Sequence, residues 1–493
     1  MEFAIYQKVR YILRCDMLPD GNEKHEVIIL KRFTAILLAL IMLLSFTACE
    51  RQREDTELKY VFLFIGDGMS FNAVQLARDV LSAREGKKSP VHLSFTDFDS
   101  VGIFTNHDKT SFIPDSASSG TAMATGKKTD SGKIAQSSLG ADLESIATLL
   151  KKECDMKVGI VTTANLNHAT PGAFYAHSSS RYNYYEIGSY IAKSDFDFFA
   201  GGQLLDADGG DENLITMAEK GGYTILDTRE EILNIKDKDQ KYLLIDPNCD
   251  STGMMSFAID REKNAFSLSD YLEICIDTID NENGFFIMCE GGRIDSALHA
   301  NDAMTAVEET LAFSDAVGKA LDFYEKHPDE TLILVTGDHE TGGLSLGYTV
   351  TQYKLYLENL VQQKLSYLAY DLNYATLYDD GTSLDTVLYD LDRLFGLDDL
   401  APHELKRVEN AFEKTVLGTE SYTDEDYISY STRTPLTVEA VRLVANRSGI
   451  EFSTFVHTAA PMVLWAKGEG EETFSGTYDN TDVYNKLYSL FFK

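Results

Sequence analysis

The feature that most constrains the fold is a set of short, almost wholly apolar runs that recur along the chain. They are 60–65, 158–163, 285–289 and 332–336. Stretches with helical periodicity separate them, among them 70–84 and 301–327. Apolar strands that alternate with helices are typical of a mainly parallel sheet whose two faces are both covered by helices. We therefore predict an α/β fold, with binding residues at the carboxyl ends of its strands.

The order of these patterns predicts one α/β domain that is interrupted by an insertion. We expect a leader and signal segment over 1–48, a charged tether over 49–58, an α/β domain over 59–343 and 451–493, and an inserted, mostly helical, cap-like subdomain over 344–450. Within the insertion, the helical patterns are 353–368, 384–395, 402–416 and 436–445. After it we expect strands at 452–456 and 462–467 and a closing helix at 482–492.

An export signal is indicated near the amino terminus. Lys31 and Arg32 precede a 16-residue apolar run, 33–48, that ends in small residues before Cys49. Such a pattern is typical of an export signal. The ending 46–49 resembles a bacterial lipobox, so we expect lipidation of Cys49, attachment to a membrane by this lipid anchor, and a periplasmic or cell-surface lipoprotein. The alternatives are an uncleaved anchor and a plain cleaved signal.

The charge of the chain limits the kinds of partner that it can bind. The chain has 44 Lys and Arg against 78 Asp and Glu, a formal net charge of -34. A protein that binds nucleic acid needs a basic face, so we expect no nucleic acid as a specific partner. The acidity does not exclude a phosphorylated substrate, because bound divalent cations dominate the potential in their own neighbourhood.

Carboxylates and histidines follow the predicted strands. Asp67 ends the first strand between two glycines, and Glu290 ends a later one. The other candidates near strand ends are Asp295, His299, Asp338, His339 and His457. Asp295 and His299 are four residues apart, so on a helix they share one face and can chelate one ion. Carboxylate and imidazole ligands suit zinc and magnesium, so the sequence predicts a metal site at this edge of the sheet.

A run of small residues predicts the attacking group. An unbroken run of small residues, 116–122 (SASSGTA), follows Asp115. Small side chains allow backbone N–H groups to approach a phosphate, and a helix that begins at Ser116 supplies its positive end there. Ser116 is then a candidate nucleophile, and the alternative is a flexible loop. Thr170 follows another predicted strand, and Arg181, eleven residues later, can bind phosphate oxygens through two parallel hydrogen bonds.

Together these motifs resemble the alkaline phosphatases, a family of phosphomonoesterases with two zinc ions and one magnesium ion. The most specific match is 113–121 (IPDSASSGT), which agrees with the nucleophile signature of the family at every position. The other matching segments are 285–295 (FFIMCEGGRID), 336–343 (TGDHETGG), His457-Thr458, 199–202 with 221–223, and 474–481. The resemblance covers 60–343 and 452–493.

The resemblance implies a role for each candidate residue. The first zinc would be held by Asp295, His299 and His457, the second by Asp67, Asp338 and His339, and the magnesium by Asp67, Thr170 and Glu290. Ser116 would be the nucleophile, and Asp115 would orient Arg181 as the clamp on the substrate phosphate. The implied reaction hydrolyses small phosphate monoesters through a phosphoserine and releases inorganic phosphate outside the cytoplasm. The implied assembly is a homodimer.

This chain departs from some members of the family at two positions. His168 stands beside the implied magnesium ligands, where some members have Asp. Ser296 follows Asp295, where some members have Lys or His that contacts phosphate through water. The first departure bears on the affinity for magnesium and the second on the release of product.

Two alternatives to the monoesterase remain open. One is a phosphodiesterase or sulfatase-like relative with the same metal core, although such relatives usually lack the pair of Thr170 and Glu290. The other is a surface lipoprotein that binds a partner through 344–450. That segment holds 11 of the 26 tyrosines, an enrichment that is typical of interfaces, but the same tyrosines would also serve as a local core.

Overall fold

The computed structural model describes residues 58–418 and 423–492. The predicted signal segment, the lipidation site Cys49 and nearly all of the tether lie outside the described residues. Within the described part, none of the helices is both long enough and apolar enough to span a bilayer.

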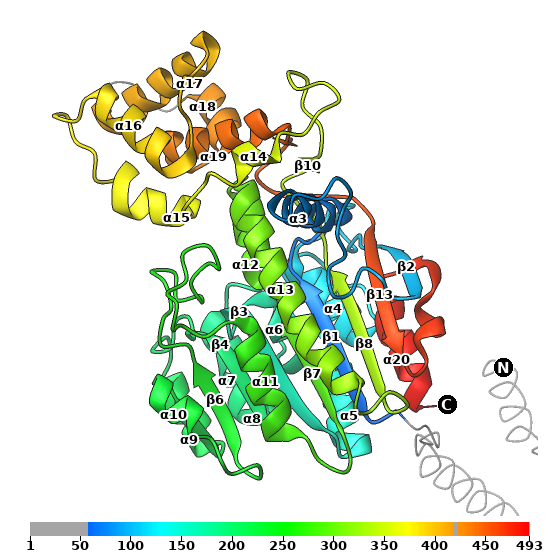
Figure 1. Ribbon diagram of the computed structural model, residues 1–493. Helices are drawn as coiled ribbons and strands as arrows, with labels where there is room; N and C mark the ends of the chain where they lie inside the picture. Colours follow the sequence, from blue (N-terminus) through cyan, green and yellow to red (C-terminus); the bar gives the residue numbers. More distant parts are fainter. Residues whose placement is uncertain (1–57, 419–422, 493) are drawn as a thin grey trace, which may run out of the picture. The chain divides into compact units, whose positions relative to one another are not determined.

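A ten-stranded sheet forms the centre of the fold (Figure 1). Its strands are β1 (Tyr60–Gly66), β2 (Ser100–Thr105), β3 (Lys157–Asn165), β4 (Phe198–Gly202), β5 (Tyr223–Leu226), β6 (Lys241–Ile245), β7 (Phe285–Glu290), β8 (Thr331–Gly337), β13 (Met462–Gly468) and β14 (Gly476–Asp479). Their order is β14-β2-β13-β8-β1-β7-β3-β4-β6-β5. Only β13 runs antiparallel to its neighbours, β2 and β8. The predicted mainly parallel α/β fold is confirmed.

The apolar strands are buried on both faces by different helices. Phe64 of β1 meets Phe313 of α13 (Ala303–Tyr324) edge-on, with 5.8 Å between ring centroids. On the opposite face, Phe286 of β7 stacks on Phe174 of α6 (Ala169–Tyr175) at 6.3 Å. Because both faces of the strands are occupied by apolar contacts, the polar residues of these segments are left to the strand ends.

The remaining helices of the α/β part surround this sheet. They are α3 (Phe71–Arg84), α4 (Ser116–Thr125), α5 (Ile146–Cys154), α7 (Tyr184–Ser189), α8 (Ile191–Ser194), α9 (Leu214–Lys220), α10 (Arg229–Leu233), α11 (Leu268–Ile279), α12 (Gly292–His299), a 3-10 turn at Glu471–Phe474, and α20 (Thr481–Phe491). The helices expected at 70–84, 301–327 and 482–492 are α3, α13 and α20. Helix α13 begins two residues later than expected because Asp302 caps it, accepting a hydrogen bond from the Thr305 N–H.

Residues 344–450 are mostly helical, as expected (Figure 1, yellow to orange). The helices are α14 (Leu357–Leu360), α15 (Tyr367–Tyr370), a π-helix at Asp371–Ala375, α16 (Leu384–Phe395), α17 (Pro402–Phe412), a second π-helix at Glu413–Leu417, α18 (Asp424–Tyr430) and α19 (Pro435–Ser448). Most of their buried apolar side chains belong to the same cluster as those of α11 and α13, whereas Tyr430 and Val438 pack with Phe455. The division of the chain into an α/β domain and a separate subdomain stays a prediction.

The single helix expected over 353–368 is wrong. The chain forms only the short α14 and α15 there, because its backbone donors reach acceptors elsewhere in the molecule. The Lys364 N–H donates to the Leu394 carbonyl, and the Ser366 N–H donates to Asp260. A tertiary contact has thus replaced the helical bond at each of these positions, which periodicity alone does not reveal.

The strand expected over 452–456 is also shorter than predicted. Only β11 (Glu451–Phe452) forms, paired with β10 (Leu344–Ser345), and the chain then bends. It returns to an extended form as β12 (His457–Thr458), which pairs with β9 (Glu340–Thr341). The bend turns the Phe455 carbonyl toward α12, where it accepts a hydrogen bond from a histidine ring.

Candidate active site

The predicted nucleophile lies at the first position of a buried helix. Asp115 caps α4 by accepting a hydrogen bond from the Ser118 N–H at 3.0 Å. Every residue of α4 is buried, which only small side chains permit at such close packing. Ser116 itself is 1% exposed, and its Oγ lies 3.1 Å from Nε2 of His339. The run of small residues is therefore a packed helix and not a flexible loop.

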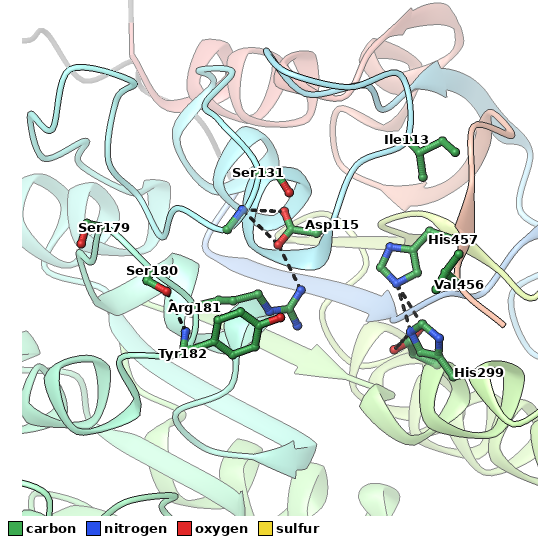
Figure 2. A pocket seen from close by; sticks show the side chains of 12 residues that line it. Ile113, Asp115, Ser131, Ser179, Ser180, Arg181, Tyr182, His299, Val456 and His457 are labelled. Carbon is green, nitrogen blue, oxygen red and sulfur yellow. Dashed lines mark hydrogen bonds and ion pairs between the residues drawn. The ribbon is translucent and has the colours of Figure 1, made fainter. Parts of the chain in front are cut away.

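Asp115 and Arg181 form an ion pair beside this serine. Arg181 donates from Nη1 to Oδ2 of Asp115 at 3.1 Å, and the Gly132 N–H donates to the same carboxylate. Burial alone would raise the pKa of Asp115, but the Arg181 guanidinium and the N–H donors lower it overall, so the carboxyl is ionised. Both side chains line a cleft of about 650 Å³, which Figure 2 shows with His299 and His457 on its other side.

Three residues at neighbouring strand ends form the first group of ligand-like side chains, Asp67, Asp338 and His339, here called the sheet cluster. Strands β1 and β8 pair in parallel with Gly66 opposite Gly337, so the residues that follow meet at one edge. His339 Nε2 lies 3.4 Å from Asp67 Oδ1 and 3.3 Å from Asp338 Oδ2. All three side chains are at most 1% exposed.

Gly68 allows the chain after β1 to pass close to Thr341 and Asp295. Its φ is +70°, and a Cβ there would lie 2.8 Å from Thr341 Oγ1 and 2.9 Å from an Asp295 oxygen. Only glycine fits both the left-handed backbone and the missing space. The Gly68 N–H also donates to Asp338 at 3.0 Å, which fixes one of the two oxygens of that carboxylate.

The tautomer of His339 follows from its neighbours. The single hydroxyl proton of Thr341 is donated to Asp295 Oδ1 at 2.6 Å, because an ionised carboxylate can only accept. The same Thr341 oxygen lies 3.2 Å from His339 Nδ1 and must therefore accept a proton from it. The Nε2 of His339 then carries a lone pair that points at the carboxylates of the sheet cluster and at Ser116.

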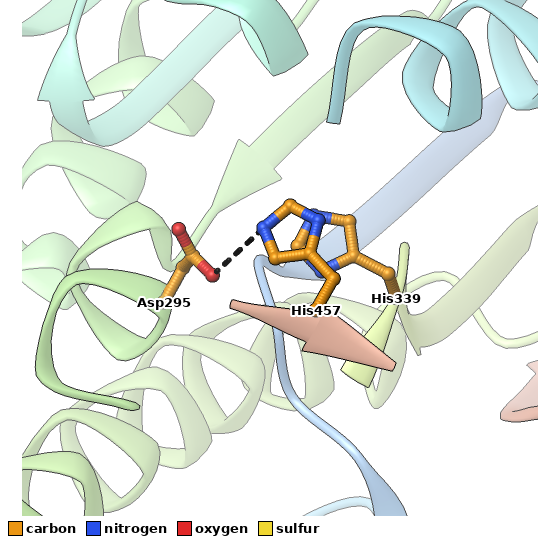
Figure 3. Close-up of side chains that lie close together, drawn as sticks. All are labelled: Asp295, His339 and His457. Carbon is orange, nitrogen blue, oxygen red and sulfur yellow. Dashed lines mark ion pairs between the residues drawn. The ribbon is translucent and has the colours of Figure 1, made fainter. Parts of the chain in front are cut away.

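A second group, here called the outer cluster, consists of Asp295, His299 and His457. His299 Nε2 lies 3.2 Å from Asp295 Oδ2 and 3.1 Å from His457 Nε2. His457 Nε2 is 3.8 Å from Asp295 Oδ1, the contact drawn in Figure 3. Their side chains are 12–26% exposed, so this cluster faces the cleft.

Backbone carbonyls orient both histidines of the outer cluster. The Phe455 carbonyl lies 2.6 Å from His299 Nδ1, and the Pro114 carbonyl lies 2.9 Å from His457 Nδ1. Since a carbonyl can only accept, each Nδ1 carries the proton and each Nε2 is left with a lone pair. In neutral rings these two lone pairs, 3.1 Å apart, would repel each other, so a proton or a metal cation must lie against them; the Asp295 carboxylate accordingly outweighs burial and raises the pKa of His299.

The two clusters are adjacent. Ligand atoms of Asp295, His339 and His457 lie within 4.8 Å of one another, as do those of the sheet cluster, so His339 belongs to both groupings. Figure 3 shows the rings of His339 and His457 side by side, with 3.6 Å between their centroids. Two cations would thus be held close to the same serine.

The predicted magnesium ligands lie on the other side of Asp67. Thr170 donates to Asp67 Oδ2 at 3.5 Å, and it also hydrogen-bonds Glu290. Glu290 is fully buried and accepts a hydrogen bond from Thr162. His168 occupies the N-cap position of α6 without a capping side-chain hydrogen bond, two residues before Thr170. Burial, with a smaller contribution from the Arg181 charge, lowers its pKa to about 4, so its ring is neutral.

The pKa shifts indicate that this region is short of positive charge. Burial, and then the charge of Asp338, raise the pKa of Asp67 well above its usual range. Burial likewise raises the pKa of Asp338 to about 7 and that of Glu290 to about 8. Asp295 differs, because His299 and His457 outweigh its burial and hold its pKa well below the usual range.

The residues fit divalent cations. Among the described residues, one oxygen each of Asp67, Asp338 and Glu290 and the Nδ1 of His168 are buried without a hydrogen-bond partner. Buried acceptors without donors are costly, and a cation satisfies several of them at once. Mixed carboxylate and imidazole donors suit zinc, and a hydroxyl with carboxylates suits magnesium.

The sequence did not reveal several residues that orient the site. Thr341 hydrogen-bonds residues of both clusters, and Thr162 hydrogen-bonds Glu290, but in the sequence they look like ordinary residues of a motif and of a strand. The carbonyls of Pro114 and Phe455 depend on backbone direction, which a sequence pattern does not give. Ser296, the second departure, points its hydroxyl at Met254 with 3.9 Å between oxygen and sulfur.

The relatives of the chain identify its class. A family model described as alkaline phosphatase matches residues 58–491. Alkaline phosphatase 3 of Bacillus subtilis is 30% identical over 457 residues, covering 89% of this chain and 90% of the relative. Alkaline phosphatase 4 of the same organism is 28% identical over 456 residues, covering 90% and 91%.

Solved structures agree with these relatives. A cold-active alkaline phosphatase from a psychrophilic Shewanella species superposes with a TM-score of 0.74 at 27% identity, covering 87% of this chain and 99% of that one. A variant of the alkaline phosphatase of the Antarctic bacterium TAB5, solved with Mg bound in its M3 site, gives 0.60 at 25% identity, covering 88% and 97%. The chain is thus an enzyme of the phosphatase class. It belongs to the alkaline phosphatase family.

Proposed function

We propose that this phosphatase hydrolyses phosphate monoesters at a site for two zinc ions and one magnesium ion, through a phosphoserine formed on Ser116. The observation that carries the proposal is the position of the Ser116 hydroxyl. It is buried at the start of α4 and lies 3.1 Å from a histidine Nε2 that also faces two buried carboxylates. A serine hydroxyl needs such an environment to become a nucleophile.

The outer cluster would hold one zinc and the sheet cluster the other, with the magnesium at Asp67, Thr170 and Glu290. When bound, these ions would lower the pKa of the serine hydroxyl and of water and would neutralise charge on the phosphate and on the leaving oxygen. The fit rests on the buried acceptors that have no donor and on the three Nε2 lone pairs that converge there.

The residues of the chain would divide the remaining work. Arg181, held by Asp115, would bind phosphate oxygens in the cleft. The Ser116 N–H, at the first position of α4, is among the groups that a helix leaves unbonded, and it would donate to the same phosphate. The Ser116 hydroxyl would lose its proton to water, and its Oγ would attack phosphorus as the ester oxygen leaves and takes a proton from water. A water molecule would then attack phosphorus and release inorganic phosphate, and Ser116 Oγ would regain a proton. Each in-line displacement inverts phosphorus, so the two together retain its configuration.

The test compares the enzyme with its Ser116→Ala variant, both loaded with zinc and magnesium, on p-nitrophenyl phosphate. We expect the variant to lose phosphate release by at least about 10³-fold. Unchanged release in the variant would overturn the proposal. Bis-p-nitrophenyl phosphate tests the diesterase alternative, because a preference for the diester would exclude a monoesterase.

We also propose that the enzyme acts outside the cytoplasm, anchored by lipid on Cys49, and forms a homodimer. The support for export is the apolar run before Cys49 and the basic pair that precedes it. Fractionation of cells that express the chain or its Cys49→Ala variant tests the anchor, which predicts that only the unchanged chain stays with the membrane. Light scattering of the protein tests the dimer.

A further inference from the structure

The insertion contacts the α/β part at the joint between α12 and α13. Helix α12 carries Asp295 and His299 and ends at His299, and Asn301 follows with a left-handed φ of 58° and no exposed surface. Arg442 of α19 donates from Nε and Nη2 to the Asn301 side-chain oxygen at 2.9 and 2.6 Å. A guanidinium from the insertion therefore fixes a residue only two positions after a ligand of the outer cluster.

A second pair of insertion donors holds the next residue of this joint. Gln363 donates from its side chain to Asp302 Oδ1 at 2.8 Å, and the Tyr367 N–H donates to Asp302 Oδ2 at 2.8 Å. Asp302 in turn caps α13 through Thr305. The short turn that joins α12 to α13 is thus bound from the insertion on two successive residues.

The same arginine also contacts the segment that leads to His457. The Arg442 guanidinium lies 4.3 Å from the centroid of the Phe455 ring. The Asn301 side-chain N–H donates to the Thr454 carbonyl at 2.9 Å. The Phe455 ring is buried with Tyr430 and Val438 of the insertion, and its carbonyl orients His299. Arg442 therefore contacts a side chain two residues from each histidine of the outer cluster, Asn301 after His299 and Phe455 before His457.

The sheet cluster is held differently. Asp67 and Asp338 follow paired central strands, and the Asp338 carbonyl accepts from Ser119 at 2.8 Å and from Asn106 at 3.2 Å. These contacts lie wholly within the α/β part. A substitution of Arg442 should therefore alter the geometry of the outer cluster much more than that of the sheet cluster.

We propose that Arg442 is a positioning residue that sets His299 and His457 for the outer metal ion, so that the insertion completes one half of the metal centre. The inference rests on the proposed zinc site. The guanidinium acts through two planar donors on one amide oxygen and through its stacking on Phe455, an arrangement that a lysine ammonium does not reproduce. Residues that orient metal ligands typically contribute about 10- to 100-fold to metal affinity.

The experiment measures zinc affinity at both sites by competition with a chelator, in the full chain and in Arg442→Met. We expect one zinc to bind about 10- to 100-fold more weakly and the other to be unchanged. Arg442→Lys should recover only part of the loss. The His457→Ala variant identifies which of the two affinities belongs to the outer cluster. At saturating zinc, kcat of Arg442→Met should return toward that of the unchanged enzyme.

Arg447→Met is the matched control. Arg447 lies on the same helix and binds Glu404 and the Asp398 carbonyl, all within the insertion. It should leave both zinc affinities unchanged, even if the melting temperature falls.

Asn301→Gly removes the acceptor of the Arg442 hydrogen bonds, while glycine keeps the left-handed backbone at this position. This variant should weaken the same zinc site. Equal weakening of both sites in Arg442→Met, or unchanged affinity in both Arg442→Met and Asn301→Gly, would overturn the inference. A wild-type chain that binds no zinc would instead overturn the proposed function.

Discussion

The sheet cluster and the outer cluster hold similar side chains but are built in different ways. Asp67, Asp338 and His339 stand on the ends of adjacent parallel strands and are fully buried. The outer cluster stands on α12, with Asp295 in its first turn and His299 in its last, and on the two-residue strand β12, and it is partly exposed to the cleft. Parallel pairing fixes strand ends to one another through many backbone bonds, whereas a helix and a two-residue strand need additional contacts to keep their distance.

The difference also appears in the ionisation of the two clusters. Burial raises the pKa of Asp67 and of Asp338, while the histidines of the outer cluster keep Asp295 ionised. A metal in the sheet cluster would therefore replace protons on carboxyl groups, and a metal in the outer cluster would be held by the facing Nε2 atoms of His299 and His457. One half of the site is thus positioned by the sheet itself, and the other half by elements that pack around the sheet.

The largest effect is expected from Asp338→Asn, which removes one carboxylate of the sheet cluster. Asp338 Oδ2 is buried without a hydrogen-bond partner, so its charge is available for a metal ion. We expect kcat/KM for p-nitrophenyl phosphate to fall on the order of 10³-fold, because the metal ion that would activate Ser116 loses one of its carboxylate ligands. Steady-state kinetics with excess zinc and magnesium measure this.

Asp246→Asn is the matched control for this substitution. Asp246 is also a buried carboxylate directly after a strand, β6, but it accepts a hydrogen bond from the Tyr271 hydroxyl at 2.9 Å and from the Asn248 N–H at 2.7 Å. Its activity should stay within about twofold of the unchanged enzyme. Comparable losses in both variants would show that burial, and not ligation, explains the effect.

The link between the clusters is tested by Thr341→Val. The change keeps the shape of the side chain but leaves His339 Nδ1 without its acceptor and Asp295 without its donor. We expect activity to fall about 10- to 100-fold and zinc to bind more weakly at both clusters. Thr341→Ser keeps the hydroxyl and should retain most of the activity. Loss at one cluster alone would mean that the two are oriented independently.

Much of the fold could be predicted because it depends on burial. The runs around Phe62, Phe286 and Ile333 are apolar at consecutive positions, and only a strand covered on both faces buries them all. The helix expected over 353–368 does not form, although the segment has helical periodicity. The backbone N–H groups of Ser366 and Lys364 donate to Asp260 and Leu394 instead. Competition of this kind between local and distant acceptors cannot be seen in a pattern of side chains.

The sequence predicted which ligand-like residues lie at the strand ends but not the groups that orient them, and the roles of these residues as ligands stay a prediction. Asp67, Glu290 and Asp338 stand at strand ends, and the sheet topology brings strand ends together. The bend that aims the Phe455 carbonyl at His299 replaced an expected strand. The Phe455 ring packs against Tyr430 and Val438 of the insertion, a contact that a pattern of residues does not reveal.

A smaller effect is expected from pH on the protein without metals. The pKa of Asp338 is 3.8 in the unfolded chain and about 7 in the folded one. Between these values the folded protein holds a proton that the unfolded chain has released, so this group lowers the free energy of unfolding as pH rises from about 4 to about 7. Asparagine cannot ionise, so the melting temperature of Asp338→Asn should rise relative to that of the unchanged protein across this window.

Zinc supplies the control for this prediction. A bound cation takes the place of the proton and stabilises the ionised carboxylate, so the unchanged protein should no longer lose stability through Asp338 when zinc is present. Thermal unfolding in chelator and in zinc, at several pH values, measures both. A difference between the two proteins that does not vary with pH in chelator would contradict the raised pKa.

The smallest effect is expected at the rim of the cleft, on the side of the outer cluster. Val456 lines the cleft beside His457 and is 59% exposed, and Ile113 and Tyr182 add further apolar surface (Figure 2). Val456→Ser should lower kcat/KM for p-nitrophenyl phosphate about two- to fivefold and leave glycerol phosphate unaffected, because only the aryl group buries apolar surface there. Val350→Ser, at a similarly exposed position of the insertion, should change neither substrate. An equal loss of kcat/KM on both esters would mean that Val456 supports His457 and does not contact the leaving group. The geometry of the outer cluster would then depend on the segment 453–456 as well as on α12.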